Sequence, residues 1–450
     1  MKAGFAKVDI TPPLGCVLNG YYTERYADRV IEPLYAIAVA YSDGQRTAVT
    51  VSLDISEILQ RDTDDIRRRI AQRTGLPFEA IFVACIHTHT APVISEIRGF
   101  FKRDPDYYES FCRRICDCVC AAMKDMTEAE AFIARNEAKG ISFVRRFRMK
   151  NGQAITNPSH TLIDQIEGPI GTPDETVQLV RLKRPGAADI AIVNFGTHPD
   201  VLGGTGICPD WPGFLRNALE GALTDEADGK GVHVIFFNGA QGDVIHLDRC
   251  SSFRPRGVEH SRHMGRVLAG AVLAVYSYAT PIDSKRVFFG QVMTPVAVAK
   301  GTDEQVRIAA EIHEKYLAGE DVSAYPFDIV MARKYLRLEH CDPTVDLNVV
   351  CVGFGDVAFV GLPGEPFTDI GREIKTASPF AMTLPCCNAN GSEGYFPTDA
   401  ALNDTGYESN SSLFLPGVAP RLIRTSLALL KQLKVSEKAT RGVPASRSQL

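Results

Sequence analysis

Apolar and polar residues follow two alternating patterns along most of the chain. Short apolar runs, typical of buried strands, occupy residues 34–41, 47–53, 80–86, 190–195, 232–237, 348–354 and 357–362. Segments with apolar side chains at helical spacing occupy residues 62–73, 107–123, 213–220, 306–316, 367–374 and 420–433. Because strand-like and helix-like segments alternate in this way in layered α/β proteins, the pattern predicts an α/β fold.

Two turns join neighbouring strands of this set. Asp43-Gly44 lies between the first two apolar runs, and Gly355-Asp356 lies between the last two. Glycine accepts the positive φ that a tight turn needs, so we expect a hairpin at the first position and a turn at the second.

The polar segments define the expected domain organisation. Residues 223–231 and 301–325 are polar and are expected to be surface insertions. Residues 434–450 are rich in Ser, Lys and Arg and lack apolar periodicity, which is typical of disorder. We therefore expect one domain over residues 1–433 and a disordered tail over residues 434–450.

Composition narrows the classes of partner. The 450 residues are 45% hydrophobic and 23% charged, with a net charge of −5, which is typical of a soluble globular chain. An acidic balance without a long basic run argues against nucleic acid or an anionic membrane as the main partner. The apolar runs are too short to span a bilayer, and the N-terminus has no apolar secretion segment. We expect a cytoplasmic protein without a membrane anchor, which could form a homo-oligomer.

The twelve cysteines are too dilute for a disulfide scaffold. The densest group is Cys112, Cys116, Cys118 and Cys120, which falls within a helical pattern. This group lacks the paired C-x-x-C spacing of a structural zinc site. We expect these side chains to lie on a buried helix face, without a redox role.

Side chains that could bind a metal or transfer protons follow four of the apolar runs. In chain order they are His87 and His89, His198, Asp243 and Glu365. In α/β sheets, ligands bind just beyond the carboxyl ends of strands. Two or three imidazoles and one carboxylate at such ends match a catalytic zinc site, which keeps one position open.

Each of these residues also has an ordinary interpretation. His87 and His89 could form a solvated or hydrogen-bonded pair, and His198 could be a buried histidine with satisfied hydrogen bonds. Glu365 could simply place an acid at the first turn of the helix over residues 367–374, where the helix dipole favours negative charge. The spacing alone therefore leaves the metal site open.

Six short motifs occur in a fixed order along residues 2–430. They are Val8-Asp9-Ile10-Thr11-Pro12-Pro13, His87-Thr88-His89-Thr90-Ala91-Pro92, Thr197-His198-Pro199, Gln241-Gly242-Asp243-Val244, Leu362-Pro363-Gly364-Glu365, and Gly394-Tyr395-Phe396-Pro397-Thr398 with Gly406-Tyr407-Glu408. Their order resembles the catalytic domain of the neutral/alkaline non-lysosomal ceramidase family. The resemblance implies mixed β-sheets layered with helices, as in that domain.

The resemblance also implies a set of site residues. Four residues would hold one zinc ion: His87, His198, Glu365 and Tyr395. Three would act on the substrate carbonyl: His89, Arg145 and Tyr407. Arg145 is included because Val144-Arg145-Arg146 matches an Asn-Arg step that offers a cationic donor.

Four further residues are candidates for substrate binding or for supporting the ligands: Asp210, Trp211, Asp243 and His246. Asp210 could orient an imidazole, or it could be the N-cap of the helix over residues 213–220. Trp211 could line the pocket or belong to the core. His246 could contact substrate, be a third imidazole near the zinc, or be an ordinary surface histidine.

The chain departs from the family at one position that matters for chemistry. Ceramidases carry a serine directly after the Gly-Asp-Val step, whereas this chain has Ile245, followed by His246. A serine nucleophile is therefore absent there. We also expect no signal peptide and no counterpart of the additional C-terminal β-domain of the ceramidases, which argues against ceramide as the substrate.

The sequence thus predicts a zinc-dependent hydrolase that cleaves an amide or ester bond of a small soluble molecule, such as an acylated amino sugar. A metal-activated water would replace the serine. One alternative is a zinc-dependent lyase acting on a sugar acid, with Tyr407 or His89 as the base. Another is a non-catalytic ligand-binding protein on the same scaffold.

Overall fold

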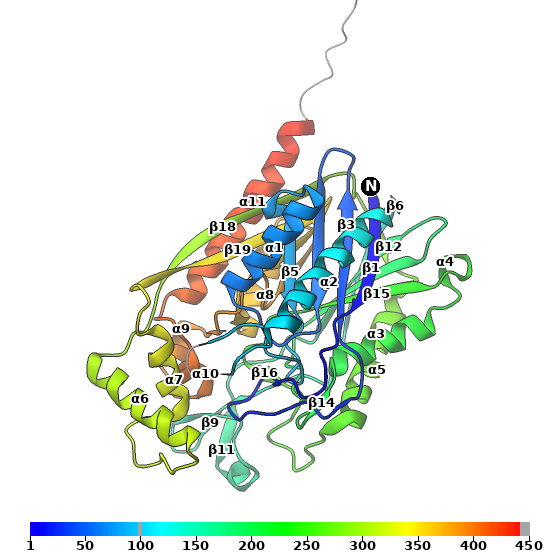
Figure 1. Cartoon of the computed structure of the whole chain (residues 1–450). Helices are drawn as coiled ribbons and strands as arrows, with labels where there is room; N and C mark the ends of the chain where they lie inside the picture. The colour runs from blue at the N-terminus through cyan, green and yellow to red at the C-terminus, as the bar shows by residue number, and fades with distance from the viewer. Residues whose placement is uncertain (98–100, 442–450) are drawn as a thin grey trace, which may run out of the picture.

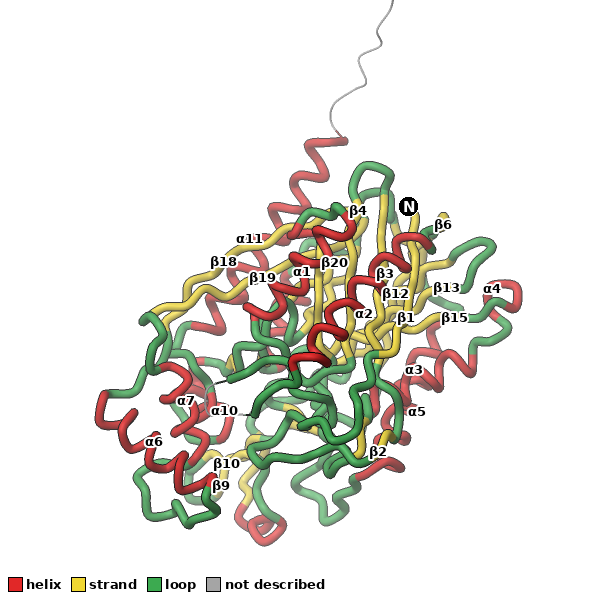
Figure 2. The backbone as a smooth tube through the Cα atoms, viewed as in Figure 1, coloured by secondary structure: helices red, strands yellow, loops and turns green. Residues whose placement is uncertain are grey.

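The computed structural model describes residues 1–97 and 101–441, which form three larger β-sheets with helices packed outside them (Figures 1 and 2). The first sheet has the order β5 (Ile81–Cys85), β4 (Thr47–Leu53), β3 (Tyr35–Ser42), β1 (Lys2–Asp9) and β6 (Thr127–Glu128). Strands β3 and β4 form the expected antiparallel hairpin, and β4 and β5 are parallel. Helices α1 (Gln60–Thr74) and α2 (Pro105–Lys124) cover one face of this sheet (Figure 1).

The second sheet carries a parallel pair at one edge. Its order is β15 (Val232–Asn238), β13 (Asp189–Phe195), β12 (Thr176–Lys183), β7 (Glu130–Glu137) and β17 (Thr280–Ile282). Strands β13 and β15 are parallel, and the other pairs are antiparallel. Helices α3 (Trp211–Ala222) and α5 (Gly257–Tyr276) pack together and against this sheet.

The third sheet has the order β18 (Val287–Ala297), β19 (Thr344–Phe354), β20 (Val357–Gly361) and β22 (Met382–Cys386). The turn between β19 and β20 contains Gly355 at φ 51°, as the sequence predicts. Helices α8 (Thr368–Ala377) and α11 (Val418–Arg441) pack on its outer face. A shared apolar cluster, with Phe82, Phe237 and Phe359 in contact, joins all three sheets. The fold is therefore the α/β arrangement of mixed sheets that we predicted.

Short elements complete the fold. The remaining strands are β2 (Arg29–Val30) paired with β14 (Gly206–Ile207), β8 (Phe143–Val144) with β16 (Val244–Ile245), β9 (Arg146–Met149) with β10 (Ala154–Thr156) and β11 (Ile166–Pro169), and β21 (Glu365–Pro366) with β23 (Tyr395–Phe396). The remaining α-helices are α4 (Glu226–Gly229), α6 (Asp303–Leu317), α7 (Ile329–Leu338), α9 (Asp399–Leu402) and α10 (Tyr407–Ser411). The 3-10 helices are Phe78–Ala80 and His160–Gln165.

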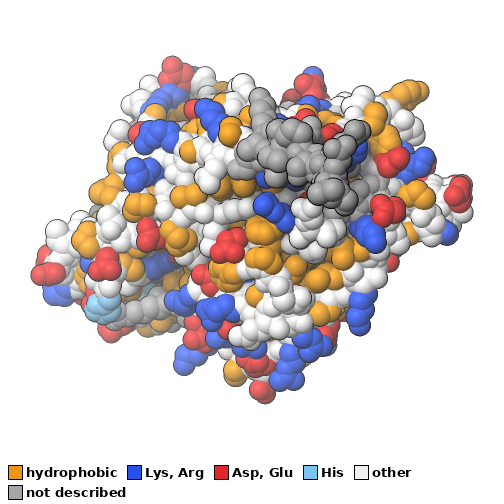
Figure 3. Space-filling view, turned by 90° about the horizontal axis from the view of Figure 1, so that it is seen from above, with side chains coloured by type: hydrophobic (Ala, Val, Ile, Leu, Met, Phe, Trp, Pro, Cys, Tyr) orange, Lys and Arg blue, Asp and Glu red, His pale blue; other side chains and the backbone are white. Residues whose placement is uncertain are grey.

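The polar insertions lie where the sequence predicts a surface. Residues 223–231 contain α4, and residues 301–325 contain α6, which packs on α7 through a small apolar core of its own. Figure 1 shows α6 and α7 at one end of the molecule, away from the three sheets. Figure 3 shows acidic and basic side chains interspersed with apolar ones on the face seen from above.

Helix α11 continues past the end that the apolar pattern predicts at residue 433. Leu433 is buried, and Lys434 Nζ forms an ion pair with Asp356, so the helix extends into the segment expected to be disordered. Residues 442–450, the rest of that expected tail, lie outside the described residues. No helix in the described part of the chain is long and apolar enough to cross a membrane.

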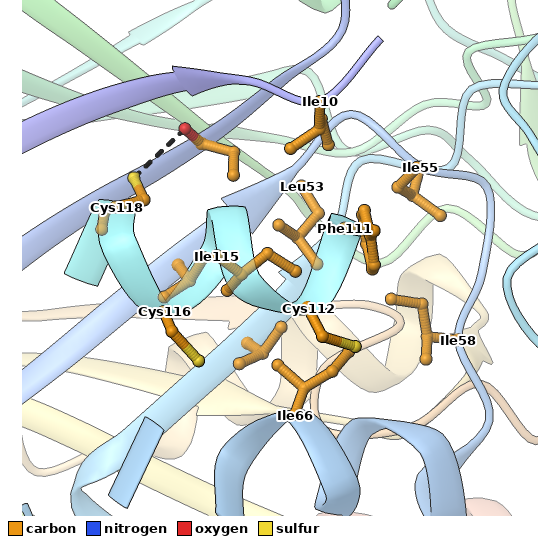
Figure 4. Packing of buried hydrophobic residues seen from close by; sticks show 14 of the residues in the cluster. Ile10, Leu53, Ile55, Ile58, Ile66, Phe111, Cys112, Ile115, Cys116 and Cys118 are labelled. Atoms are coloured by element: carbon orange, nitrogen blue, oxygen red, sulfur yellow. Dashed lines mark hydrogen bonds between the residues drawn. The ribbon is translucent and has the colours of Figure 1, made fainter. Parts of the chain in front are cut away.

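The cysteine-rich face of α2 packs against the first sheet and α1 (Figure 4). Cys112 and Cys118 are fully buried, and Cys116 is nearly so, whereas Cys120 is half-buried. The Sγ of Cys118 donates to backbone carbonyl oxygens of β1 and β3, and burial raises the pKa of this thiol to about 12. These cysteines act as small core side chains, as expected.

Candidate metal centre

Three imidazoles that follow two different strands meet in one cluster. His87 and His89 follow β5, and His198 follows β13. Their ring centroids are 5.0 Å (His87–His89), 5.2 Å (His87–His198) and 6.0 Å (His89–His198) apart. One nitrogen from each ring lies within 4.8 Å of the others, so the three histidines could hold a metal ion. His87 has a φ of 74°, an uncommon conformation for a residue with a side chain, at the point where the chain leaves β5.

Glu365 and Tyr395 join the same cluster. The Oε2 of Glu365 lies 3.2 Å from His87 Nε2 and 3.0 Å from His198 Nε2. The hydroxyl of Tyr395 lies 3.4 Å from His198 Nε2. Strands β21 and β23 are parallel and place Glu365 and Tyr395 directly opposite each other. The structure thus brings together all four residues expected to be metal ligands.

The hydrogen bonds of His87 and His198 determine which nitrogen of each ring faces the cluster. His87 Nδ1 lies 2.8 Å from the carbonyl oxygen of Ser56, and His198 Nδ1 lies 2.9 Å from that of Gln241 and 3.0 Å from that of Val244. A carbonyl only accepts, so each Nδ1 carries the proton and each Nε2 of a neutral ring is an acceptor. This arrangement is the usual support for a histidine that binds a metal.

The donor set fits a cation. Two Nε2 acceptors face the Glu365 carboxylate, whose Oε2 is buried and has no hydrogen-bond donor within the described chain. Burial lowers the pKa of His198 to about 4, so this ring is neutral at pH 7. Burial opposes ionisation of Glu365, but the two histidines hold its pKa well below the usual range. Burial opposes protonation of His87, but the Glu365 carboxylate raises its pKa, so this pair holds a positive charge between them, either a proton or a metal ion. Nitrogen and oxygen donors of this kind suit zinc.

Arg145 and Tyr407 lie beside this cluster, as the sequence predicts. The guanidinium carbon of Arg145 is 5.3 Å from the ring centroid of Tyr395 and 5.8 Å from that of Tyr407. Arg145 Nε is 2.7 Å from Glu408 Oε1, and an Nη donates to the carbonyl oxygen of Gly242 at 2.8 Å. The ion pair with Glu408 therefore fixes the cation next to both tyrosines.

Several residues of the site carried no signal that we recognised in the sequence. His89 Nδ1 lies 3.7 Å from Asp200 Oδ1, and Asp200 accepts a short hydrogen bond from the hydroxyl of Tyr21. The hydroxyl of Tyr22 lies 3.0 Å from that of Tyr407. Asp200 stands two residues after His198, and that proximity could have identified it. Tyr21 and Tyr22 lie in an irregular segment whose path depends on distant contacts.

A cavity of about 150 Å³ opens beside these groups. The candidate residues that line it are His87, His89, Glu365, Tyr395 and Tyr407. Tyr21, Tyr22 and Glu57 also line it. A small molecule in this cavity would therefore contact the cluster from its open side.

Asp210 is the N-cap of α3 and does not orient an imidazole. Its carboxylate accepts hydrogen bonds from the backbone N–H groups of Val201 (2.9 Å), Leu202 (3.1 Å) and Trp211 (2.7 Å), and from the hydroxyl of Ser261 (2.5 Å). No histidine nitrogen in the described part of the chain lies within 4 Å of it. Asp210 thus fixes the loop that follows His198.

Trp211 belongs to the core, so the pocket-lining alternative is wrong. It is fully buried, with ring centroids 5.0 Å from Phe236 and 6.2 Å from Phe195. Its indole Nε1 donates to the carbonyl oxygen of His198 at 3.4 Å. It supports the backbone of a candidate ligand from behind.

Asp243 and His246 are both buried away from the cavity lining. Asp243 Oδ1 accepts from the backbone N–H and the hydroxyl of Thr368, both at 2.7 Å, which ties the turn after β15 to the start of α8. The surface interpretation of His246 is wrong, because pairing of β16 with β8 carries this segment inward. The third imidazole of the cluster is His89, so that role of His246 is also wrong. A substrate contact through His246 stays a prediction.

The support that Asp210 gives to the loop after His198 can be tested by D210N. Asparagine also tolerates the φ of 57° at this position, but its amide presents one acceptor oxygen where the carboxylate presents two. We expect the free energy of unfolding in urea to fall by about 1–3 kcal/mol, because buried N–H groups lose an acceptor. D225N is the matched control, since Asp225 is exposed and its side chain caps nothing. Equal effects of the two substitutions would contradict this role.

Comparison with known proteins finds similar structures but no similar sequences. No protein-family model matches the sequence, and no curated protein matches it either. The structure is similar to neutral ceramidase from Pseudomonas aeruginosa, with a TM-score of 0.75, 16% identity, and coverage of 96% of this chain and 75% of that chain. It is also similar to a ceramidase complexed with C2, with a TM-score of 0.73, 15% identity, and coverage of 100% and 76%. The chain therefore has a ceramidase-like fold.

Proposed function

We propose that this ceramidase-like chain is a zinc-dependent hydrolase that cleaves an amide bond, or an ester bond, of a small substrate. One observation carries the proposal. The Nε2 atoms of His87 and His198 converge on the Glu365 carboxylate, while each Nδ1 is held by a backbone carbonyl. When bound there, zinc would supply Lewis acidity that polarises a carbonyl and lowers the pKa of water.

His89 is suited to move protons in this site. Burial and the neighbouring histidines lower its pKa well below the usual value, so the resting ring is neutral and one of its nitrogens has a lone pair. Asp200, 3.7 Å from Nδ1, would stabilise the imidazolium that forms. His89 would take a proton from water and return it to the leaving amine or alcohol.

Tyr407 and Arg145 would stabilise the charge that develops on the substrate carbonyl oxygen. Burial raises the pKa of Tyr407 well above its usual range, so its hydroxyl stays protonated and can donate. The Arg145 guanidinium adds positive potential beside both tyrosine rings. Donors fixed before the reaction stabilise a transition state without reorganisation.

Metal analysis of the purified protein is the direct test. We expect mass spectrometry to find about one equivalent of zinc, as for a mononuclear catalytic site. After chelation, zinc at about 100 times its Kd should raise the free energy of unfolding by about 2.7 kcal/mol. Magnesium at the same concentration is the control, because Mg²⁺ prefers oxygen ligands and binds histidine nitrogens weakly. Less than about a tenth of an equivalent, with no stabilisation by added zinc, would contradict the proposal.

A second candidate function is elimination from a sugar acid. His89 and Tyr407 line the same cavity and could act as a base and an acid on one substrate. Product analysis separates the two reactions, since elimination gives an unsaturated product that absorbs in the ultraviolet. Hydrolysis of an amide instead releases a free amine and a carboxylic acid.

A further inference from the structure

Helix α7 forms one wall of the cavity that contains the candidate catalytic residues. Four of its residues line that cavity: Val330, Arg333, Lys334 and Arg337. Figure 1 shows α7 next to α10, which begins at Tyr407. Three of the four are cationic, although the chain as a whole carries a net charge of −5. Positive charge is therefore concentrated on this one wall.

The three cations differ in their surroundings. Arg337 is neutralised by Glu393, with an Nη to Oε2 distance of 2.7 Å. Arg333 is buried, and its guanidinium carbon lies 5.1 Å from the ring centroid of Tyr22 and 5.7 Å from that of Tyr316. These aromatic rings hold the Arg333 cation at the wall.

Lys334 is a cation with no counter-charge among the residues that the structure describes. No carboxylate oxygen in the described chain lies within 4 Å of its Nζ, and none of the hydrogen bonds of the described residues involves its side chain. It is half-buried, and burial lowers the pKa of its ammonium to about 8, so it is still mostly charged at pH 7. A partly desolvated ammonium is stabilised by an anion that enters the cavity.

The acidic residues of the cavity lie on other elements. Glu365 belongs to the histidine cluster, and Glu57 accepts a hydrogen bond from the Asn19 side chain at 3.0 Å.

Arg333 also donates to the carbonyl oxygen of Tyr22 at 3.3 Å, and the Tyr22 hydroxyl lies 3.0 Å from that of Tyr407. The cationic wall is therefore connected to the candidate catalytic side chains through one tyrosine.

We propose that Lys334, together with Arg333, binds an anionic group of the substrate, a carboxylate, sulfate ester or phosphate ester, while the bond to be cleaved lies at the histidine cluster. This inference rests on the proposed function and names its substrate class. It accounts for two cations on a helix that lies outside the three sheets and shares a small apolar core with α6.

The test uses matched pairs of ligands and the zinc-loaded protein. N-acetylglucosamine is compared with its 6-sulfate, its 6-phosphate and N-acetylmuramic acid, which adds a carboxylate, by calorimetric titration. We expect at least one anionic member to bind about tenfold more tightly than the neutral sugar, and less so at high salt, where a charged pair is screened. K334Q should remove this preference, and K334E should reverse it.

K315Q is the control, because Lys315 lies on the neighbouring helix α6 but is 40% exposed and does not line the cavity. It should keep the full preference. The inference is overturned if no anionic ligand binds more tightly than the neutral one, or if the preference survives in both Lys334 variants. If the protein holds zinc but shows either of these binding results, only this inference fails and the proposed function stands. If the protein holds no zinc, the proposed function itself fails.

Discussion

Replacement of His198 by alanine is expected to leave the purified protein with less than about a tenth of an equivalent of zinc. His198 Nε2 is one of two nitrogens that face the Glu365 carboxylate, and its Nδ1 is held by two backbone carbonyls. Loss of an outer partner of a ligand already lowers metal affinity about 10- to 100-fold, so loss of the ligand itself should have a larger effect. Mass spectrometry of the purified variant measures the metal, and amine release measures the activity.

H89A is the matched control, since it removes an imidazole from the same cluster. Neither ring nitrogen of His89 has a hydrogen-bond partner within the described chain, so this ring is less firmly oriented than the other two. We expect H89A to retain zinc and to lose hydrolysis, as a proton-transfer residue should. A full equivalent of zinc in H198A would refute the proposed ligand set, and loss of zinc from H89A would make His89 a ligand.

Removal of the Asp54 carboxylate should destabilise the fold strongly. Asp54 and Arg216 form a two-pronged ion pair with distances of 2.8 and 2.5 Å, and both side chains are about 2% exposed or less. D54A would leave a buried guanidinium without its partner, and it would also remove the acceptor for the backbone N–H of Tyr35. We expect the free energy of unfolding, measured in guanidinium chloride, to fall by about 3–5 kcal/mol.

E304A supplies the comparison for a surface ion pair. Glu304 pairs with Arg307 at 2.8 Å, but both side chains are about two-thirds exposed. Solvent screens such a pair, so its loss should change stability only slightly. A change of that small size in D54A would show that water reaches Arg216 in the variant.

Several of the strands that the sequence predicts have side chains buried on both faces. The apolar run over residues 80–86 became β5, and that over residues 190–195 became β13, both fully buried. Strands β7 and β18 escaped the sequence pattern because their buried positions alternate with polar or exposed ones. For such strands the neighbouring sheet, rather than local hydrophobicity, determines the structure.

The residues of the candidate site also fall into those that the sequence locates and those that depend on long-range contacts. His87, His198 and Glu365 could be located because each follows a buried strand. Tyr395 came only from the family resemblance, since its position depends on the two-residue pairing of β21 with β23. Pairing of β16 with β8 likewise buries His246, and no local pattern reveals it. Lys334 lies on α7, whose packing beside α10 is a long-range contact.

The pairing of Glu365 with Tyr395 has a consequence for biosynthesis. His87 emerges from the ribosome early, but β23 follows only after most of the chain has been translated. A metal ion held by the proposed ligand set would therefore meet all four residues only late in synthesis, after the first sheet can already have formed. A nascent chain arrested before Tyr395 would lack one of the four proposed ligands, although the carbonyl groups that hold His87 and His198 would already be present.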